Sequence, residues 1–496
     1  MDSSEQALRF HEEGLNAFRE QRFDVAVESF QKALRLSPSS PVLLWNLGNA
    51  LALNGNWDLA KNQWLRAVDL NPEFGDAHLN LGTYYAEHRD HEHALKHLGR
   101  ALTLMPQRAE IQASLGHLCT RIGKISEAIV YFQRAYHLDP QKREFLLNYG
   151  IACDKEGQSS LAVHAYHEVI RSSKELEVQA RVFWGLMCLQ RRHFRAGWAL
   201  AESRHAMQNL YPKELVPSQP LEKDLRGQRL FILDEQGLGD TLQFIRFAPL
   251  LKHRGAEVRF ISNAAMSSLL TRTPGLDAVD QEADVRPTDR IIPTMSLPYF
   301  LQLHSEEDYR MDRPYIFPRL DWVQEMARQL EEFKGPRKLN VGIVWKGNPN
   351  HRWDHLRSIS FENVDRAWIQ NPKLKDIAWV SVQLDEGSSQ MFKGTSKDGR
   401  LSPSESFEQT AGLIQNLDVL ITVDTSMAHL AGAMGKRVWL LLPPQPDWRW
   451  GLKGSSSIWY PSMRLYRAQH FLKWDDVFQK VTEDLAGEIK GAVSAV

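Results

Sequence analysis

Two short segments in the second half of the chain place glycine, aspartate and hydroxyl side chains directly after an apolar run. The residues are Gly237, Gly239, Asp240, Asp424, Thr425, Ser426 and His429. An amphipathic run follows in both places, so these residues stand where a strand ends and a helix begins. A helix N-terminus at that position offers free N–H groups and a partial positive charge, which suit a phosphate. The pattern predicts anion binding beside carboxylates that can take up a proton.

Both aspartates also have a structural alternative. Asp240 and Asp424 can each cap the helix that follows, which is the commonest role of Asp at that position. The first loop lacks the third glycine of G-x-G-x-x-G and carries no Walker lysine. These departures disfavour a dinucleotide site and a P-loop.

Cationic side chains follow another apolar run and can balance a negative leaving group. They are Lys346, Arg352 and Arg357, of which Lys346 is the best candidate by position. Fixed positive charge of this kind stabilises a departing phosphate. Arg357 can equally pair with Asp354 on the same loop. Gln383, at the end of the next strand, is expected to point to where a nucleotide base or ribose would lie.

Alternating strands and helices must position these residues. The stretches with the pattern of buried strands are 229–234, 257–262, the start of 340–349, 377–383 and both ends of 418–444. Strands that alternate with helices predict parallel sheets. Residues 319–333 are expected to form a helix that connects one sheet to the next. Two Rossmann-like lobes, residues 227–335 and 336–496, with a cleft between them are the simplest arrangement.

A dense group of aromatic residues lies near the end of the second lobe. The residues are Trp448, Trp450, Trp459 and Tyr460. Their rings can stack on a base or a sugar, but we favour a core at the interface between the lobes. Asp447 and Arg449 are then candidates for a polar lining of the cleft.

The first half of the chain has a 34-residue repeat. The glycines that mark it are Gly14, Gly48, Gly82, Gly116 and Gly150, and alanine and proline positions keep the same step. The pattern resembles the tetratricopeptide repeat (TPR), two helices per unit that stack into a superhelix with a concave groove. The resemblance covers about residues 7–176. A further, degenerate helical pair is expected at 183–204, which gives a helical domain 1–206 and a linker 207–226.

Asparagines recur at one position of the repeat, as Asn46, Asn80 and Asn148. An amide both donates and accepts hydrogen bonds, so such a ladder can hold an extended acceptor peptide. It is similar to the asparagine ladder of O-linked N-acetylglucosamine transferases. The alternative is that these amides satisfy neighbouring helix ends within the stack. Cys119 and Cys153 share another repeat position, which favours packing over redox chemistry.

The order and separation of three segments carry a second resemblance. QGLGDTLQFIRFAPLL, GIVWKGNPNHRWDHLRSI and VDTSMAHLAGAMGKRVWLLLP resemble the heptosyltransferase-like glycosyltransferases, which have the two-lobed GT-B fold. With DWRW and WYPSMRLYR, the chain looks like bacterial proteins that fuse TPR repeats to such a domain. Members of that group are implicated in protein glycosylation, including that of flagellin. The expected fold is an all-α TPR superhelix followed by an α/β GT-B domain.

This resemblance implies roles for individual residues. It makes Asp240 the base and turns Asp424, Thr425 and His429 toward the donor diphosphate. Lys346, by its position, is the second catalytic candidate and would supply positive charge for the leaving group. Ser426 replaces a glycine of the family. The remaining residues assigned to donor binding are Gly237, Gly239, Thr241, Gln243, Asn348, Arg357 and Gln383. The family also implies inversion, no metal cofactor and a last helix that crosses back to the first lobe.

Composition excludes several other classes. Sixty Lys and Arg against 61 Asp and Glu give a net charge of −1, which argues against a broad nucleic-acid or membrane footprint. The start, MDSSEQALRF, resembles no signal peptide, and apolar runs are far shorter than the roughly 20 residues that span a bilayer. We expect a cytoplasmic protein without disulfides.

The sequence thus predicts an enzyme that moves a sugar from a nucleotide-sugar to a Ser or Thr hydroxyl of a protein held by the TPR groove, with flagellin as a candidate. The rival is a TPR scaffold whose second half has lost catalysis, and a third hypothesis replaces the protein acceptor by a glycan or a lipid-linked acceptor. An exposed Asp240 facing a cleft, with Lys346 opposite, would favour the enzyme. An Asp240 buried in a helix cap would favour the scaffold.

Overall fold

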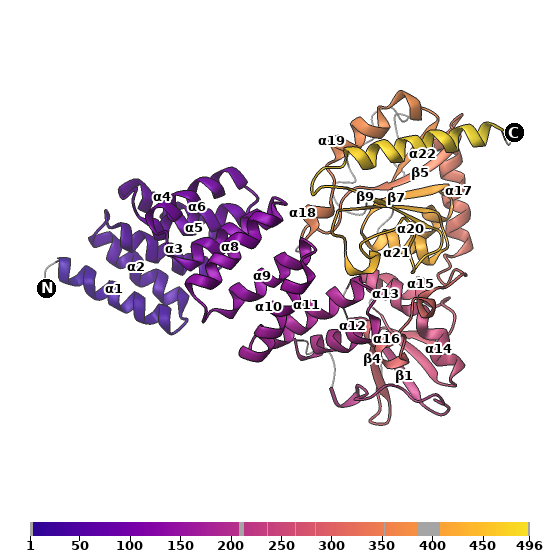
Figure 1. The fold of residues 1–496 in the computed structure, drawn as a ribbon, viewed down its shortest axis with the longest axis horizontal. Coiled ribbons are helices and arrows are strands. Elements are labelled where there is room, and N and C mark those ends of the chain that lie inside the picture. Colours follow the sequence, from indigo (N-terminus) through magenta and orange to yellow (C-terminus); the bar gives the residue numbers. More distant parts are fainter. Residues whose placement is uncertain are drawn as a thin grey trace. The chain divides into compact units, whose positions relative to one another are not determined.

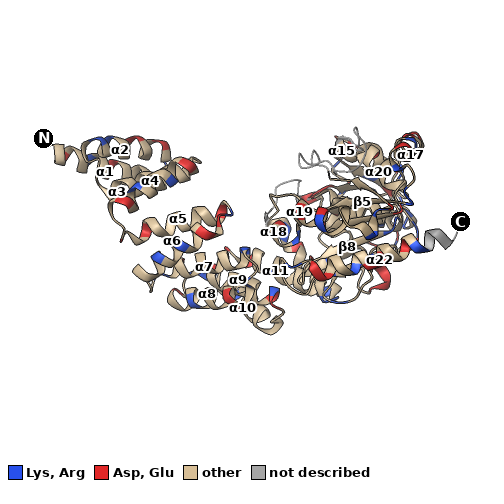
Figure 2. Cartoon of the chain, turned by 90° about the horizontal axis from the view of Figure 1, so that it is seen from above, with Lys and Arg blue, Asp and Glu red and all other residues tan. Residues whose placement is uncertain are grey.

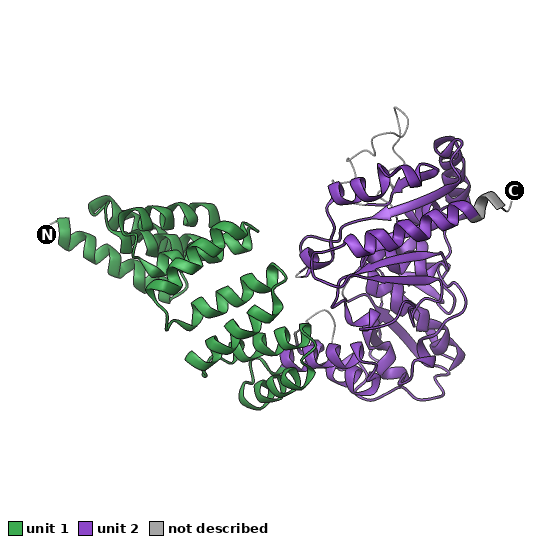
Figure 3. Ribbon diagram, turned by 45° about the horizontal axis from the view of Figure 1, so that its top comes forward, with its two compact units in different colours: residues 1–177 green, residues 178–496 purple. Residues whose placement is uncertain are grey.

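The computed structural model describes residues 3–207, 213–235, 237–262, 264–282, 284–351, 353–383 and 407–494. The chain divides into two compact units, residues 1–177 and 178–496 (Figure 3). No helix within the described ranges is long and apolar enough to cross a bilayer. Arg352 lies outside the described residues.

The first unit consists of antiparallel helix pairs (Figure 1). The helices are α1 (Ser3–Arg19), α2 (Phe23–Leu36), α3 (Pro41–Leu53), α4 (Trp57–Leu70), α5 (Gly75–Glu87), α6 (His91–Leu104), α7 (Ala109–Arg121), α8 (Ile125–Leu138), α9 (Arg143–Lys155) and α10 (Ser159–Ser172). From α2 to α8, each second helix of a pair ends two residues before the repeated proline. This confirms the expected helix stop, because the residue before a proline avoids the helical conformation.

The repeated glycines make room for a bulky side chain of the same repeat. A Cβ atom on Gly116 would lie 2.7 Å from Phe132 Cε1, and Gly48 and Trp64 meet in the same way. Phe132 and Trp64 are buried. The bulky residue therefore fills the space between the two helices of its own repeat, which explains why glycine and a large side chain recur together.

The expected helical domain 1–206 is divided in the structure. Helices α11 (Glu177–Gln190) and α12 (Phe194–Ala201) and the 3-10 helix η1 (Glu202–Met207) form the predicted further helical region, but residues from 178 onward belong to the second unit. Trp198 is the reason: its Nε1 donates to Tyr309 Oη at 2.7 Å, and its ring packs edge-on against Trp448. The helical pair is thus part of the core of the second half.

The first sheet is parallel, with strand order β3-β2-β1-β4. Its strands are β1 (Arg229–Leu233), β2 (Glu257–Ile261), β3 (Ala278–Asp280) and β4 (Arg290–Pro293). Its helices are η2 (Lys213–Leu215), α13 (Leu238–Phe244), η3 (Ile245–Phe247), α14 (Ala248–His253), α15 (Ala264–Leu270), η4 (Thr294–Ser296), α16 (Leu297–Leu301) and η5 (Glu307–Tyr309). Residues 241–255, one amphipathic run in the sequence, are interrupted at η3 because Pro249 has no N–H for a continuous helix.

The second sheet is also parallel, with strand order β6-β5-β7-β8-β9. Its strands are β5 (Leu339–Val344), β6 (Ile377–Ser381), β7 (Val419–Val423), β8 (Val438–Leu442) and β9 (Met463–Arg467). Its helices are α17 (Leu320–Lys334), α18 (Asp354–Arg357), α19 (Phe361–Val364), the π-helical turn η6 (Asp365–Ile369), η7 (Pro372–Leu374), α20 (Phe407–Gln415), α21 (Ser426–Ala433), η9 (Trp448–Trp450) and α22 (Asp475–Ser494). Both sheets have the predicted parallel arrangement.

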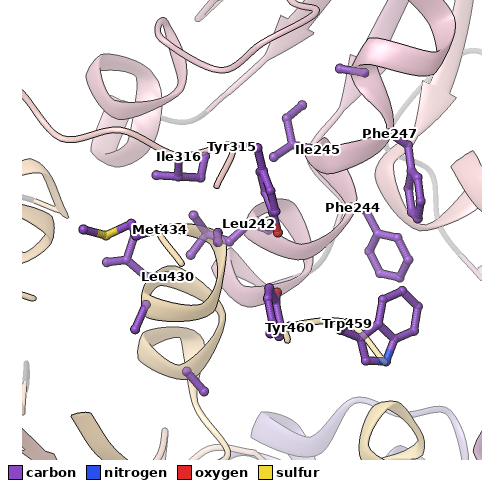
Figure 4. Packing of buried hydrophobic residues seen from close by; sticks show 14 of the residues in the cluster. Leu242, Phe244, Ile245, Phe247, Tyr315, Ile316, Leu430, Met434, Trp459 and Tyr460 are labelled. Atoms are coloured by element: carbon purple, nitrogen blue, oxygen red, sulfur yellow. Dashed lines mark hydrogen bonds between the residues drawn. The ribbon is translucent and has the colours of Figure 1, made fainter. Parts of the chain in front are cut away.

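One continuous core joins the two sheets. It includes Leu242 and Phe244 of α13, Leu430 of α21, and Trp459 and Tyr460 (Figure 4). The expectation of an aromatic core between the lobes is confirmed, because Trp448, Trp450, Trp459 and Tyr460 are all buried in this cluster. The lobes share apolar packing at this point.

A second core covers the other face of the second sheet. Val477, Phe478 and Val481 of α22 pack there against strand residues such as Val341 and Ile421. The last helix therefore covers its own lobe, and the expectation that it crosses back to the first lobe is wrong. The apolar face of α22 packs on the second sheet.

Candidate functional site

The strand orders mark one point in each sheet where a ligand can bind. In parallel sheets, ligands bind outside the carboxyl ends of the strands where the winding reverses. The second sheet reverses between β5 and β7, which are followed by Trp345–Gly347 and Asp424–Ser426. The first sheet reverses between β1 and β4. The sequence-predicted residues of both loops thus follow these points.

The reversal point of the first sheet is filled by an ionic cluster. Arg204 of η1 donates to Glu235, directly after β1, through Nε at 2.7 Å and Nη2 at 3.2 Å. It also donates to Ser296 Oγ at 2.7 Å and to Glu202 at 2.8 Å. The Glu235 side chain is completely buried. Our sequence analysis missed this cluster; its one sequence signal was a glutamate at the end of a buried strand.

The two lobes meet at the glycine loop. A Cβ atom on Gly239 would lie 3.0 Å from His429 Cδ2 and 3.5 Å from Ser426 Cα. Any other residue here would have to push the His429 ring away by a few tenths of an ångström, so glycine favours this close approach of the loop to the first turn of α21. Gly239 therefore lets the loops of both lobes approach closely, and Gly237 N–H donates to Asp240 Oδ2 within its own loop at 3.0 Å.

Asp240 has two interactions that use both of its carboxylate oxygens. Oδ2 caps the first turn of α13 through Gly237, and Oδ1 accepts a hydrogen bond from Arg449 Nη2 of the other lobe. Its side chain is 15% exposed. The structure thus places Asp240 at the junction of the lobes and also in the capping role that sequence analysis left open.

Arg449 is the centre of the polar network between the lobes. Besides Asp240, its Nη1 donates to Asp447 at 2.8 Å and its Nε donates to Gln243 Oε1 at 2.6 Å. The guanidinium lies 4.4 Å from the centre of the Trp448 ring. Burial lowers the pKa of Arg449, but the charges of Asp447 and Asp240 outweigh burial and raise it.

Asp424 and His429 lie beside this network and are buried. Burial, and next the charge of Asp447, raises the pKa of Asp424 to about 6, although Arg357 and Arg449 oppose this shift. Burial, with Arg449 next, lowers the pKa of His429 well below its ordinary value. The His429 ring contacts Tyr460 Oη through Nδ1 at 2.9 Å and stacks on Trp450. It is a neutral part of the interlobe core.

Gln383 holds the chain at the end of β5. Its Oε1 accepts from the N–H groups of Trp345 and Lys346, both at 3.3 Å, and its Nε2 donates to Lys346 O at 3.0 Å. The structure therefore uses this amide to fix the half-buried Lys346. Arg357 pairs with Asp354 at 3.2 Å, which is the alternative that the sequence left open.

The remaining predicted donor-binding residues make hydrogen bonds within the chain. Thr241 is buried and donates to Asp234 Oδ1 at 2.5 Å, and Thr425 contacts Thr422 Oγ1 at 3.1 Å. Asn348 is exposed, and its Oδ1 accepts from Asn350 N–H at 2.9 Å. Among the described residues, no group of His, Cys, Asp and Glu side chains is arranged to hold a metal ion.

The asparagines of the repeat bond their neighbours in the helical stack. Asn46 Nδ2 lies 2.9 Å from His11 Nε2, and Asn80 Nδ2 donates to Asn49 Oδ1 at 2.5 Å. Asn46 and Asn148 are buried. For Asn46 and Asn80 the structure thus shows bonds within the stack, as the alternative to peptide binding expected, but the partners are side chains of neighbouring helices and not helix ends.

Comparison with known proteins supports the repeat assignment. A family model of the tetratricopeptide repeat matches residues 11–72, 47–109 and 79–143. The N-terminal helices form tetratricopeptide repeats. Protein FlbA of Caulobacter vibrioides (strain ATCC 19089 / CIP 103742 / CB 15) is 23% identical over 327 residues, which are 58% of this chain and 52% of FlbA. The chain thus spans about half the length of this curated relative.

Several solved structures are also similar. PilF of Pseudomonas aeruginosa is 17% identical, with a TM-score of 0.38 over 42% of this chain and 96% of PilF. YrrB, a TPR protein with an unusual peptide-binding site, is 21% identical, with a TM-score of 0.29 over 34% and 87%. MamA residues 41–end of Desulfovibrio magneticus RS-1 are 20% identical, with a TM-score of 0.32 over 34% and 98%.

Acidic and basic residues are intermixed along the TPR helices (Figure 2). The TPR unit also carries exposed apolar side chains, among them Leu53, Trp57 and Leu59. TPR repeats suggest binding of a protein partner. The mixed charges give no reason to expect a nucleic acid there.

Proposed function

We propose that this chain is a GT-B glycosyltransferase that moves a sugar from a nucleotide-sugar to a Ser or Thr hydroxyl of a protein, with flagellin as a candidate. The TPR unit recruits that protein. One observation carries the proposal: the loop after β1 of the first sheet and the segment after β8 of the second sheet, next to the reversal point at β7, meet at a buried set of carboxylates and guanidiniums, at Asp240 and Arg449. This is where an α/β protein binds anionic ligands.

The chemistry needs few groups. The acceptor hydroxyl attacks the anomeric carbon while Asp240 takes its proton, and the bond from that carbon to the diphosphate breaks. The electron pair leaves with the nucleoside diphosphate, whose charge is balanced by Lys346 and the N-terminus of α21. Attack from the face opposite the leaving group inverts the anomeric configuration. The cations of the chain supply the positive charge in this proposal, without a metal cofactor.

A second candidate is a TPR scaffold whose second half has lost catalysis. The engagement of both Asp240 oxygens favours it, since a carboxylate held by a helix cap and a guanidinium is not free to accept a proton. Under this candidate the polar network has a structural role and joins the lobes. The two candidates differ in what Asp240 does when a donor is present.

The test is transfer by the full chain with a panel of UDP-, GDP-, ADP- and CMP-sugars and cell lysate. Mass spectrometry of the lysate proteins records added sugar. The enzyme proposal expects mass addition with at least one donor and its loss in Asp240→Asn, while Asp224→Asn, which changes an exposed carboxylate, retains it. No addition with any donor, together with wild-type behaviour of Asp240→Asn in cells, would leave the scaffold as the function.

A further inference from the structure

Arg449 stands where a diphosphate could replace one of its partners. Its guanidinium reaches Asp240 across the lobes, and its segment follows β8, the neighbour of β7. The loop after β7 holds Asp424 and the start of α21. A planar guanidinium donates to two oxygens of a phosphate as readily as to a carboxylate.

A free hydrogen-bond donor lies next to this guanidinium. Gln243 is completely buried, and its Nε2 has no hydrogen-bond partner among the described residues. The orientation of the amide is fixed, because its Oε1 accepts from Arg449 Nε and a reversed amide would oppose two donors. A buried N–H without an acceptor costs free energy until an acceptor arrives.

Replacement of Asp240 by a phosphate at Arg449 is favoured over binding of the phosphate as an additional partner. Arg449 already contacts Asp240 and Asp447, and Asp424 is near enough to feel its charge. A further anion added to these carboxylates would be repelled. A phosphate that takes the place of Asp240 leaves the buried guanidinium paired with two anionic groups, Asp447 and the phosphate, as it was with Asp447 and Asp240 before.

Resting on the proposed function, we propose that Arg449 also binds the diphosphate and that donor binding releases Asp240. The Arg449–Asp240 hydrogen bond breaks, Arg449 Nη2 donates to a phosphate oxygen, and Gln243 Nε2 is placed to donate to the same group. Asp240 is then free to accept the proton of the acceptor hydroxyl. The base is held inactive by Arg449 until a donor is present.

The test measures binding of UDP, GDP, ADP and CDP to the full chain by isothermal titration calorimetry. Arg449→Lys keeps the positive charge but loses the planar guanidinium that donates to two oxygens. We expect roughly 10- to 100-fold weaker binding of the preferred nucleoside diphosphate. Asp240→Asn removes the competing charge, and we expect roughly 2- to 10-fold tighter binding together with lost transfer. Asp224→Asn is the control and leaves affinity unchanged.

Opposite effects of the two variants distinguish this role from a structural one. If the ion pair only joins the lobes, Arg449→Lys and Asp240→Asn both weaken binding, and the inference fails while transfer by the wild type keeps the proposed function. A wild type that neither binds a nucleoside diphosphate nor transfers sugar overturns both. If Arg449→Lys fails to fold, Asp240→Asn decides: tighter binding supports the inference and weaker binding overturns it.

Discussion

Burial of Asp424 disfavours the charged form of its carboxyl group. Its pKa rises from an ordinary value of 3.8 to about 6, with burial as the main cause. The folded state therefore binds this proton more tightly than the unfolded chain does. The resulting stability is present below about pH 4 and is lost as the pH rises through about 6.

Asp424→Asn tests this directly, because an amide stays neutral at every pH. We expect the variant to be more stable than the wild type by roughly 1–3 kcal/mol above pH 7, with the difference vanishing below about pH 4. Urea unfolding of the full chain at pH 4, 5.5 and 7.5 measures it. A stability difference that does not change with pH, or one that grows toward acid, would contradict the assignment. The exposed variant Asp224→Asn should show no gain that rises with pH.

At the scale of the element, the repeated glycine is a packing position. Gly116→Ala places a methyl group 2.7 Å from the Phe132 ring, and we expect a loss of about 1–3 kcal/mol of stability from overpacking. Gly99 lies within α6, and an added Cβ meets nothing within 4 Å, so Gly99→Ala should stabilise by about 0.5–1 kcal/mol. Urea denaturation compares the two. Equal shifts would show that helix propensity, and not packing, decides both.

Much of the element order could be predicted from the sequence, because local patterns determine it. The 34-residue step predicted the helix ends, and apolar runs predicted β1, β2, β5, β6, β7 and β8. Strands β3 and β4 have three and four residues, too few for a periodicity to be detected. The direction of α22 was missed because an amphipathic pattern shows that a helix packs on a core but not on which core.

The site was predictable only in part, for the same reason. Sheet topology brings the Gly237–Asp240 loop and the Asp424–Ser426 turn to the carboxyl ends of strands, and strand patterns reveal that much. The partner of Asp240 is 209 residues away in sequence. Spacing cannot predict such a contact, nor that Gln383 and His429 make their hydrogen bonds to the protein itself. The raised pKa of Asp424 also depends on burial that composition does not reveal.

At the scale of the whole molecule, the boundary between the units predicts which fragments fold. Residues 178–496 retain Phe194 and Trp198 in the shared core, whereas 207–496 lose both and uncover Tyr309 and Trp448. Loss of a large buried aromatic side chain costs about 3–5 kcal/mol. We expect 178–496 to be monomeric or uniformly assembled with a cooperative unfolding transition, and 207–496 to aggregate. Size-exclusion chromatography and circular dichroism compare them. Equal behaviour would mean that α12 is dispensable.

The buried cysteines can report local opening of the helices that bury them, without an added label. Burial raises the pKa of Cys119 and of Cys153 to about 11, so on the order of one thiol in 10,000 is ionised at pH 7 while the helices stay closed. Cys119 and Cys153 lie in successive repeats, and Cys188 lies in α11 of the other unit. A thiol reagent followed by peptide mapping would therefore time the opening of three separate places in one unlabelled molecule, and would show whether a bound partner or donor keeps each of them shut.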